Sequence, residues 1–160
     1  MLKKMLGALR GKNDLVKAAR NGDRKRFAEV FGPADVLFLQ LPPGMEEGLD
    51  PGISQDELLE KVRAAAQDLG GREEFTPYCI VRNGQSRTLL FTSQELAQKF
   101  TEMRFRETQR IMPFQVLTVA GEALAGLFAS GQTAVFNIGS ESQFEVSAED
   151  ARLIAERWAK

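Results

Sequence analysis

The sequence contains no histidine, and this absence removes most familiar catalytic arrangements from consideration. Histidine is the usual general base near neutral pH and the commonest protein ligand of metal ions. A Ser-His-Asp triad, a Cys-His nucleophile pair and a histidine-containing zinc site are therefore excluded. An acid–base enzyme built from this chain would need carboxylates, lysine, Cys79 or Tyr78 with shifted pKa values.

Cysteine is nearly absent as well, because Cys79 is the only one in the 160 residues. One thiol cannot form an internal disulfide framework or a multi-cysteine metal site. This composition fits the reducing cytosol, so we expect a cytoplasmic protein. Cys79 lies in a stretch typical of a strand, where a buried and unreactive thiol is the expected outcome.

Motifs for cofactors and metals are also missing. The chain has neither a Gly-x-Gly-x-x-Gly sequence nor a Walker sequence, so a standard nucleotide cradle is unsupported and we expect no cofactor. The carboxylates of residues 44–57 suit magnesium, but their spacing does not match a calcium-binding loop. We interpret this segment as a solvated loop and predict no metal site. These absences favour a non-catalytic protein and leave an enzyme as the less favoured alternative.

Length and hydrophobicity indicate one globular domain. Apolar residues make up 43% of the chain and charged residues 27%, which is ordinary for a soluble protein. No apolar run approaches the roughly 18 residues that span a bilayer, so we expect no membrane-spanning helix and do not favour a membrane partner. A chain of this size can bury about 70% of its unfolded surface, which is enough for a self-sufficient core.

The first residues form a basic amphipathic segment. The first 30 residues carry nine basic and three acidic side chains, although the whole chain has a net charge of −1. Within residues 1–12, apolar side chains recur at helical spacing: Leu2, Met5, Leu6 and Leu9. So short a helix is unstable alone, and we predict that it docks on its own domain or on a second copy. The more specific alternative is that this helix binds a membrane surface or a groove of a partner protein. We therefore divide the chain into this segment and a domain at residues 13–160.

Hydrophobic periodicity predicts an α/β fold with a mixed sheet of about five or six strands and helices packed on it. Residues 36–41 form a continuous apolar run, as expected of a strand buried on both faces. Asn83 and Gly84 indicate a β-hairpin between strands at residues 78–81 and 88–91. From Thr88 onward, strands and helices alternate, which favours parallel pairing with right-handed crossovers.

The chain is organised around residues 133–147, which read as a strand, a polar turn, a second strand and a helix cap at Ser147. We expect Phe136 to be buried on the first strand and the helix that carries Trp158 to dock beside it. Gly139 can adopt a positive φ, so successive backbone N–H groups of the turn could form an anion nest. The candidate ligand-binding residues are Asn137, Gly139, Ser140 and Glu141. The simpler interpretation is a structural turn held by Asn and Ser hydrogen bonds.

A second group of polar residues is a loose basic cluster on one helix and just beyond it: Lys99, Arg104, Arg106 and Arg110. Nucleic-acid binding would require a stronger positive balance and interleaved aromatic residues, although Phe105 lies within the cluster. We therefore expect no specific nucleic-acid partner.

Three short motifs resemble the SseB family N-terminal domain. They are Phe-Thr-Ser at residues 91–93, Val-Leu-Thr-Val-Ala-Gly-Glu-Ala-Leu at residues 116–124, and Asn-Ile-Gly-Ser-Glu at residues 137–141 with Phe-Glu-Val-Ser at residues 144–147. The resemblance covers about residues 78–157, with a weaker likeness at residues 14–39. Ile138 stands where the family usually has proline. The resemblance implies an α/β domain of bacterial cytoplasmic proteins and carries no agreed biochemical activity.

Two functions follow from these observations. The first is a non-catalytic protein-interaction or regulatory module that binds a protein partner or associates with itself. The second is a small-ligand or anion-binding domain that uses the turn at residues 137–141, with an enzyme as one form of this alternative. A deep pocket that reaches Gly139 and is lined by converging polar groups would favour the second function.

Overall fold

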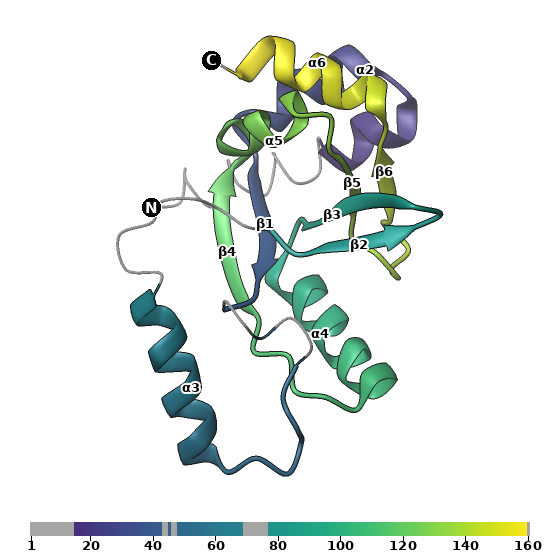
Figure 1. Ribbon diagram of the computed structural model, residues 1–160. Helices are drawn as coiled ribbons and strands as arrows, with labels where there is room; N and C mark the ends of the chain where they lie inside the picture. Colours follow the sequence, from purple (N-terminus) through teal and green to yellow (C-terminus); the bar gives the residue numbers. More distant parts are fainter. Residues whose placement is uncertain (1–14, 43–44, 46–47, 69–76, 160) are drawn as a thin grey trace, which may run out of the picture.

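The computed structural model describes residues 15–42, 45, 48–68 and 77–159, and it shows a single α/β domain (Figure 1). Six strands form one mixed sheet: β1 (Asp35–Gln40), β2 (Cys79–Arg82), β3 (Gln85–Phe91), β4 (Gln115–Ala120), β5 (Thr133–Phe136) and β6 (Phe144–Val146). The helices are α2 (Arg24–Phe31), α3 (Gln55–Asp68), α4 (Gln94–Thr108), α5 (Ala125–Ala129) and α6 (Ala148–Trp158). Residues 15–21 are also helical, and a 3-10 turn at Gly121–Leu124 precedes α5. The predicted fold class is confirmed.

The strand order is β4-β1-β3-β5-β6, and β2 pairs with β3. Strands β3 and β5 are parallel, as the alternation of strands and helices predicted. Strand β4 runs in the same direction but does not pair with β3, because β1 lies between them and is antiparallel to both. The central place of β1 agrees with its sequence, since all its residues after Asp35 are buried.

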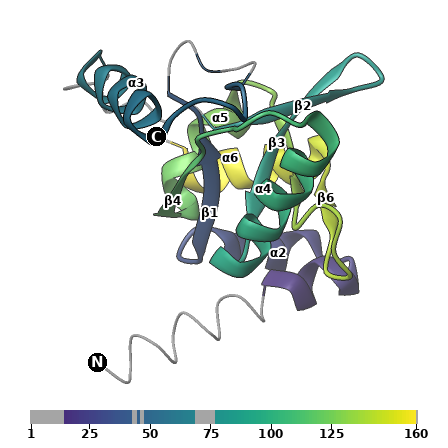
Figure 2. The same ribbon diagram turned by 90° about the horizontal axis from the view of Figure 1, so that it is seen from below.

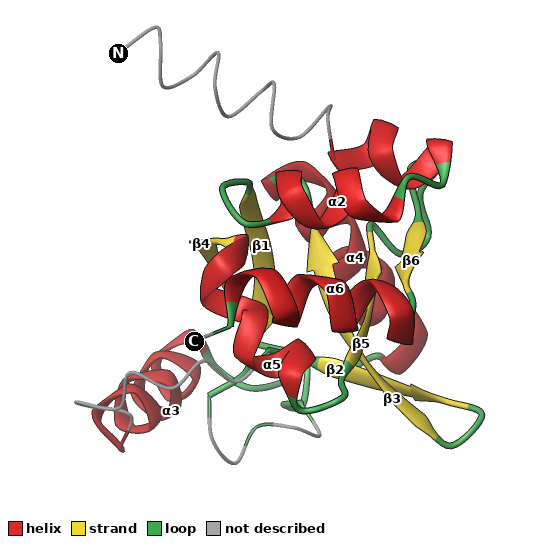
Figure 3. Cartoon of the chain, turned by 90° about the horizontal axis from the view of Figure 1, so that it is seen from above, coloured by secondary structure: helices red, strands yellow, loops and turns green. Residues whose placement is uncertain are grey.

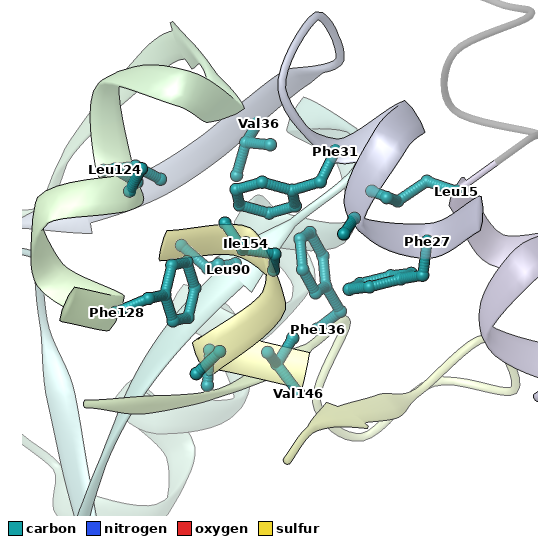
Figure 4. Packing of buried hydrophobic residues seen from close by; sticks show 14 of the residues in the cluster. Leu15, Phe27, Phe31, Val36, Leu90, Leu124, Phe128, Phe136, Val146 and Ile154 are labelled. Carbon is teal, nitrogen blue, oxygen red and sulfur yellow. The ribbon is translucent and has the colours of Figure 1, made fainter. Parts of the chain in front are cut away.

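The first face of the sheet carries the larger core and is covered by α2, α5 and α6 (Figure 3). Aromatic side chains dominate this core, and Figure 4 shows Phe31, Phe128 and Phe136 converging beneath Ile154 of α6. Phe136 is fully buried, as predicted, and its ring stacks on Phe144 with the centroids 4.7 Å apart. The first face is therefore closed by three helices.

Helix α6 docks on this core in the predicted way. Its N-cap residue Ser147 accepts a hydrogen bond from the Asp150 amide at 3.2 Å, and the Asp150 carboxylate accepts one from the Ser147 amide, which completes a capping box. At the other end, the Trp158 indole donates to the Ala28 carbonyl at 2.7 Å. The capping box fixes the start of α6, and the Trp158 hydrogen bond holds its C-terminal end against α2.

Among the described helices, only α4 covers the second face of the sheet (Figure 2). Its core is smaller and consists of alternate residues of the same strands, which point away from the first face: Leu37, Leu39, Leu89, Phe91 and Val135, joined by Ala97 and Phe100 of α4. No described helix covers the part of this face beside β2.

The predicted hairpin is confirmed and projects from the body of the domain (Figures 2 and 3). Arg82 pairs with Gln85, so the loop contains only Asn83 and Gly84. Both have positive φ, 52° and 76°, which is the signature of a type I′ turn. Val81 of β2 is among the most exposed apolar side chains of the described residues, at 72%.

Helix α3 stands beside the sheet and is held by a small separate cluster that includes Met45, Leu49 and Ile111 (Figure 1). Leu58 and Val62 of α3 pack on this cluster. Ser54 accepts a hydrogen bond from the Glu57 amide at 3.2 Å and caps the first turn of α3. None of the helices in the described ranges is long and apolar enough to cross a membrane.

Candidate functional site

The turn at residues 137–143 follows β5 and begins with a buried asparagine. Asn137 has 0% of its surface exposed and a φ of 54°, a left-handed conformation that asparagine tolerates better than most residues. Its Oδ1 accepts a hydrogen bond from the Thr92 amide at 2.9 Å. Its Nδ2 donates to Thr92 Oγ1 at 3.1 Å and lies 3.4 Å from Ser142 Oγ. The Asn137 side chain therefore points inward and joins two segments of the fold.

Backbone amides of the turn donate hydrogen bonds within the turn itself. The Ser140 amide donates to the Asn137 carbonyl at 3.1 Å, and the Ser140 hydroxyl donates to the same carbonyl at 2.7 Å. The Gly139 amide donates to Gln143 Oε1 at 2.8 Å, and Gly139 has the predicted positive φ of 80°. Two of the N–H groups that an anion nest would use are thus already engaged.

The four predicted ligand-binding residues share this turn but differ in environment. Asn137 is buried, Ser140 is half-buried, and Gly139 and Glu141 are exposed. Gly139 alone among them lines a cavity, which opens beside Met103 of α4. The turn therefore contributes a wall to a larger site.

That site is a groove of about 480 Å³ between β2, the C-terminal half of α4 and the turn. Besides the exposed Val81, its apolar lining includes five residues that belong to the second face: Tyr78, Ile80, Phe100, Met103 and Ile138. Phe100 belongs to the core of the second face, and the other four are partly buried side chains packed against that core. The groove is therefore the place where the second core of the protein opens to solvent.

Two aromatic contacts hold the floor of the groove in position. The Tyr78 ring lies 6.3 Å from Phe100 and 4.9 Å from Phe114, in the second case edge to face. The Tyr78 amide also donates to the Leu39 carbonyl at 2.6 Å, which anchors the residue before β2 to the centre of the sheet. A floor built from ring contacts of this kind is rigid and apolar.

The polar lining of the groove consists of Arg104, Glu107 and Gln143. Arg104 Nη1 lies 3.7 Å from Glu107 Oε2, an ion pair longer than a hydrogen bond. Arg104 Nε is buried and has no hydrogen-bond partner among the described residues. From the sequence, Arg104 was one of four residues in a basic cluster. Its place in the groove and its buried Nε follow only from the packing of α4.

The other members of the basic cluster have different surroundings. Lys99 forms an ion pair with Glu95 at 3.5 Å, and Arg110 donates to the Gly48 carbonyl at 3.1 Å. Arg106 is exposed on the last turn of α4 and, with Lys99, borders an adjoining cavity that Glu102 and Glu107 also line. Acidic side chains therefore interrupt the cluster, which does not form one basic surface.

Cys79 borders the same groove, and its thiol is engaged in contacts with neighbouring residues. The thiol lies 3.4 Å from the Pro77 carbonyl, to which it donates, and 3.6 Å from the Thr88 hydroxyl. It is half-buried rather than fully buried as expected. No histidine exists to activate it, so the geometry gives it a packing role.

A second cavity, of about 580 Å³, lies at the opposite end of β5 and is lined mainly by polar residues. Arg87 and Glu145 form an ion pair across β5 and border this cavity. Within the described part of the chain, no group of three or more cysteine, aspartate or glutamate side chains could hold a metal ion. Leu2, Met5, Leu6 and Leu9, predicted to dock on a partner, lie outside the described residues.

Comparison of the chain with protein-family models, with curated proteins and with solved structures gave no match.

Proposed function

We propose that this domain, which resembles the SseB family, is a non-catalytic protein-interaction or regulatory module. The groove between β2, α4 and the turn would receive an extended segment of a partner protein. The observation that carries the proposal is the open end of the second core, where a 480 Å³ groove with an apolar floor reaches solvent beside β2. Exposed apolar surface in a concave site is typical of a binding surface.

The edge of strand β2 supports an extended ligand. Among the described strands, β2 pairs only with β3, so no described strand covers its other edge. The groove borders four successive residues, from Tyr78 to Val81, whose side chains point alternately to opposite faces of the sheet. This stretch therefore forms one wall of the groove. Strand addition to such an edge supplies main-chain hydrogen bonds, and adjacent pockets supply specificity.

The alternative function, binding of an anion by the turn at residues 137–141, has weaker support. The groove does reach Gly139, as that alternative requires. However, the amides of Gly139 and Ser140 donate to Gln143 and Asn137, so an anion would have to displace these bonds. Displacing a satisfied hydrogen bond removes much of the gain from the new one.

The test uses a displayed library of short random peptides, from which those that bind the full-length protein are selected. Affinities of synthetic versions of the selected peptides are measured by fluorescence anisotropy. Met103→Glu places a charge in the groove on a helical residue, and Leu59→Glu makes the same kind of change on α3, where Leu59 is 61% exposed. We expect Met103→Glu to abolish binding and Leu59→Glu to leave it unchanged, with both variants folded by circular dichroism.

Two outcomes would overturn the proposal. One is that no peptide is enriched above the background of the library, and the other is that selected peptides bind Met103→Glu as tightly as the wild type. Titration with inorganic phosphate, followed by NMR, examines the alternative. Saturable shifts confined to residues 137–141, without peptide binding, would favour the anion-binding domain.

A further inference from the structure

Arg104 is the positively charged residue among those that line the groove. It lies in the C-terminal half of α4, and 34% of its side chain is exposed. Its Nε is shielded from water and has no hydrogen-bond partner among the described residues. A buried donor without an acceptor is unfavourable, and more so when the group is charged. Because Nε is closed to solvent, a ligand in the groove would meet the exposed part of the side chain, whose contact with Glu107 is longer than a hydrogen bond.

The carboxylate nearest to Arg104 does not satisfy it. Glu107 lies 3.7 Å from Nη1, its own side chain is 56% exposed, and the pair spans one turn of α4. Exposed pairs of this kind interact weakly. Arg87 provides a contrast, because its Nε is also buried and unpaired, but its Nη1 donates directly to Glu145. Of these two arginines, only Arg104 lacks a hydrogen-bonded carboxylate among the described residues.

The remainder of the groove requires apolar groups next to the carboxylate. Phe100, Met103 and Ile80 line the same cavity as Arg104. A ligand with only a carboxylate would leave this apolar surface in contact with water, and a purely apolar ligand would leave Arg104 unpaired and further desolvated. The two requirements together describe an acidic side chain flanked by apolar ones.

We propose that the groove recognises an extended peptide segment in which a glutamate or aspartate side chain pairs with Arg104 while neighbouring apolar side chains cover the floor. This inference rests on the proposed function and adds the chemistry of the partner. An internal acidic residue fits better than a free C-terminal carboxylate. Capture of a chain end commonly uses a nest of backbone amides, and the nearby amides of Gly139 and Ser140 are already engaged.

The probe is a set of acetylated and amidated peptides with alternating apolar and polar positions, in which the central polar residue is Glu, Gln or Lys. We expect the Glu peptide to bind the full chain about tenfold more tightly than the Gln peptide, which is about 1.4 kcal/mol, and the Lys peptide to bind most weakly. Added salt should reduce this preference, because screening weakens the charge pair.

Arg104→Gln and Arg106→Gln form a matched pair, since both remove one positive charge from α4 and only Arg104 lines the groove. Arg104→Gln should bring the affinity for the Glu peptide down to that for the Gln peptide. Arg106→Gln should preserve the preference. Thermal unfolding of both variants checks that the helix is intact.

The failures of the two proposals are distinguishable. Two results would overturn the proposal of an acidic partner but not that of a peptide-binding groove. They are equal binding of the Glu and Gln peptides, and an Arg104→Gln variant that still prefers the Glu peptide. No binding by any peptide would overturn both proposals. A further peptide has a free C-terminus and a central Gln. If only this peptide binds, the groove recognises a C-terminal carboxylate and the proposed internal acidic residue is wrong.

Discussion

The side-chain Oδ1 of Asn137 accepts a hydrogen bond from the backbone amide of Thr92 at 2.9 Å, and both residues are buried. Thr92 directly follows β3 and precedes Ser93, whose hydroxyl accepts a hydrogen bond from the Leu96 amide and caps α4. Asn137 begins the turn that forms one wall of the groove. This single contact therefore links two walls of the candidate site, α4 and the turn.

Asn137→Ala should destabilise the protein more than Asn137→Gly. Both variants leave the Thr92 amide without its buried acceptor, which costs about 1–3 kcal/mol. Alanine must also adopt the left-handed backbone conformation that Asn137 has at φ 54°, which adds roughly 1 kcal/mol. Urea unfolding of the wild type and the two variants measures the difference. Equal midpoints for alanine and glycine would show that the backbone relaxes when the side chain is removed.

Phe136→Ala should lower the free energy of unfolding by about 3–5 kcal/mol, because the ring is fully buried and its removal leaves a cavity. Phe136 stacks on Phe144 and meets the Phe31 ring edge to face at 6.2 Å. The control is Phe105→Ala, whose side chain is 41% exposed and whose loss should cost about 0.5 kcal/mol or less. Chemical denaturation measures both changes. Similar losses for the two variants would contradict the assigned core.

The ion pairs on α6 should contribute to stability only above the acidic range. A hydrogen bond from Arg152 lowers the pKa of Glu149 from its ordinary value of 4.5. A lowered pKa in the folded state stabilises the protein above the unfolded-state pKa, and this contribution disappears as the pH falls through the folded-state pKa. We expect Glu149→Gln to be less stable than the wild type at neutral pH and equally stable in acid. A constant difference across the whole pH range would assign the effect to helix packing instead.

Deletion of residues 1–12 tests the docking predicted for Leu2, Met5, Leu6 and Leu9. Burial of each large apolar side chain is worth roughly 1.5–3 kcal/mol, so the deleted form should lose stability or the ability to self-associate. Light scattering reports the oligomeric state, and sedimentation with anionic liposomes separates protein docking from membrane binding, which salt should weaken. A monomeric intact protein that ignores liposomes and loses no stability on deletion would refute the prediction.

Local structure was predictable because it depends on residues close together in the chain. Asn83 and Gly84 predicted the hairpin, since few other residues accept two successive positive φ angles. The alternation between residues 143 and 147 predicted a strand that ends at the Ser147 cap, and both features are present. The apolar run at residues 36–41 predicted a strand buried on both faces, and β1 is one.

Strand pairing was predictable only in part. The alternation after Thr88 correctly predicted that β3 and β5 are parallel. It did not show that β1 separates β3 from β4, because that arrangement depends on which distant strand completes the apolar surface on both sides. Sequence spacing carries no direct information about such non-local pairing.

The amino-acid sequence was enough to determine the helices and strands, the absence of histidine chemistry and the sharp turn after β5. Tertiary structure alone decided that Asn137 points into the protein, that the amides of Gly139 and Ser140 are engaged, and that Arg104 differs from Arg106. The reason is physical. Dihedral preferences and periodicity act over a few residues, whereas the burial of a polar atom and the partners it finds depend on segments far away in the chain.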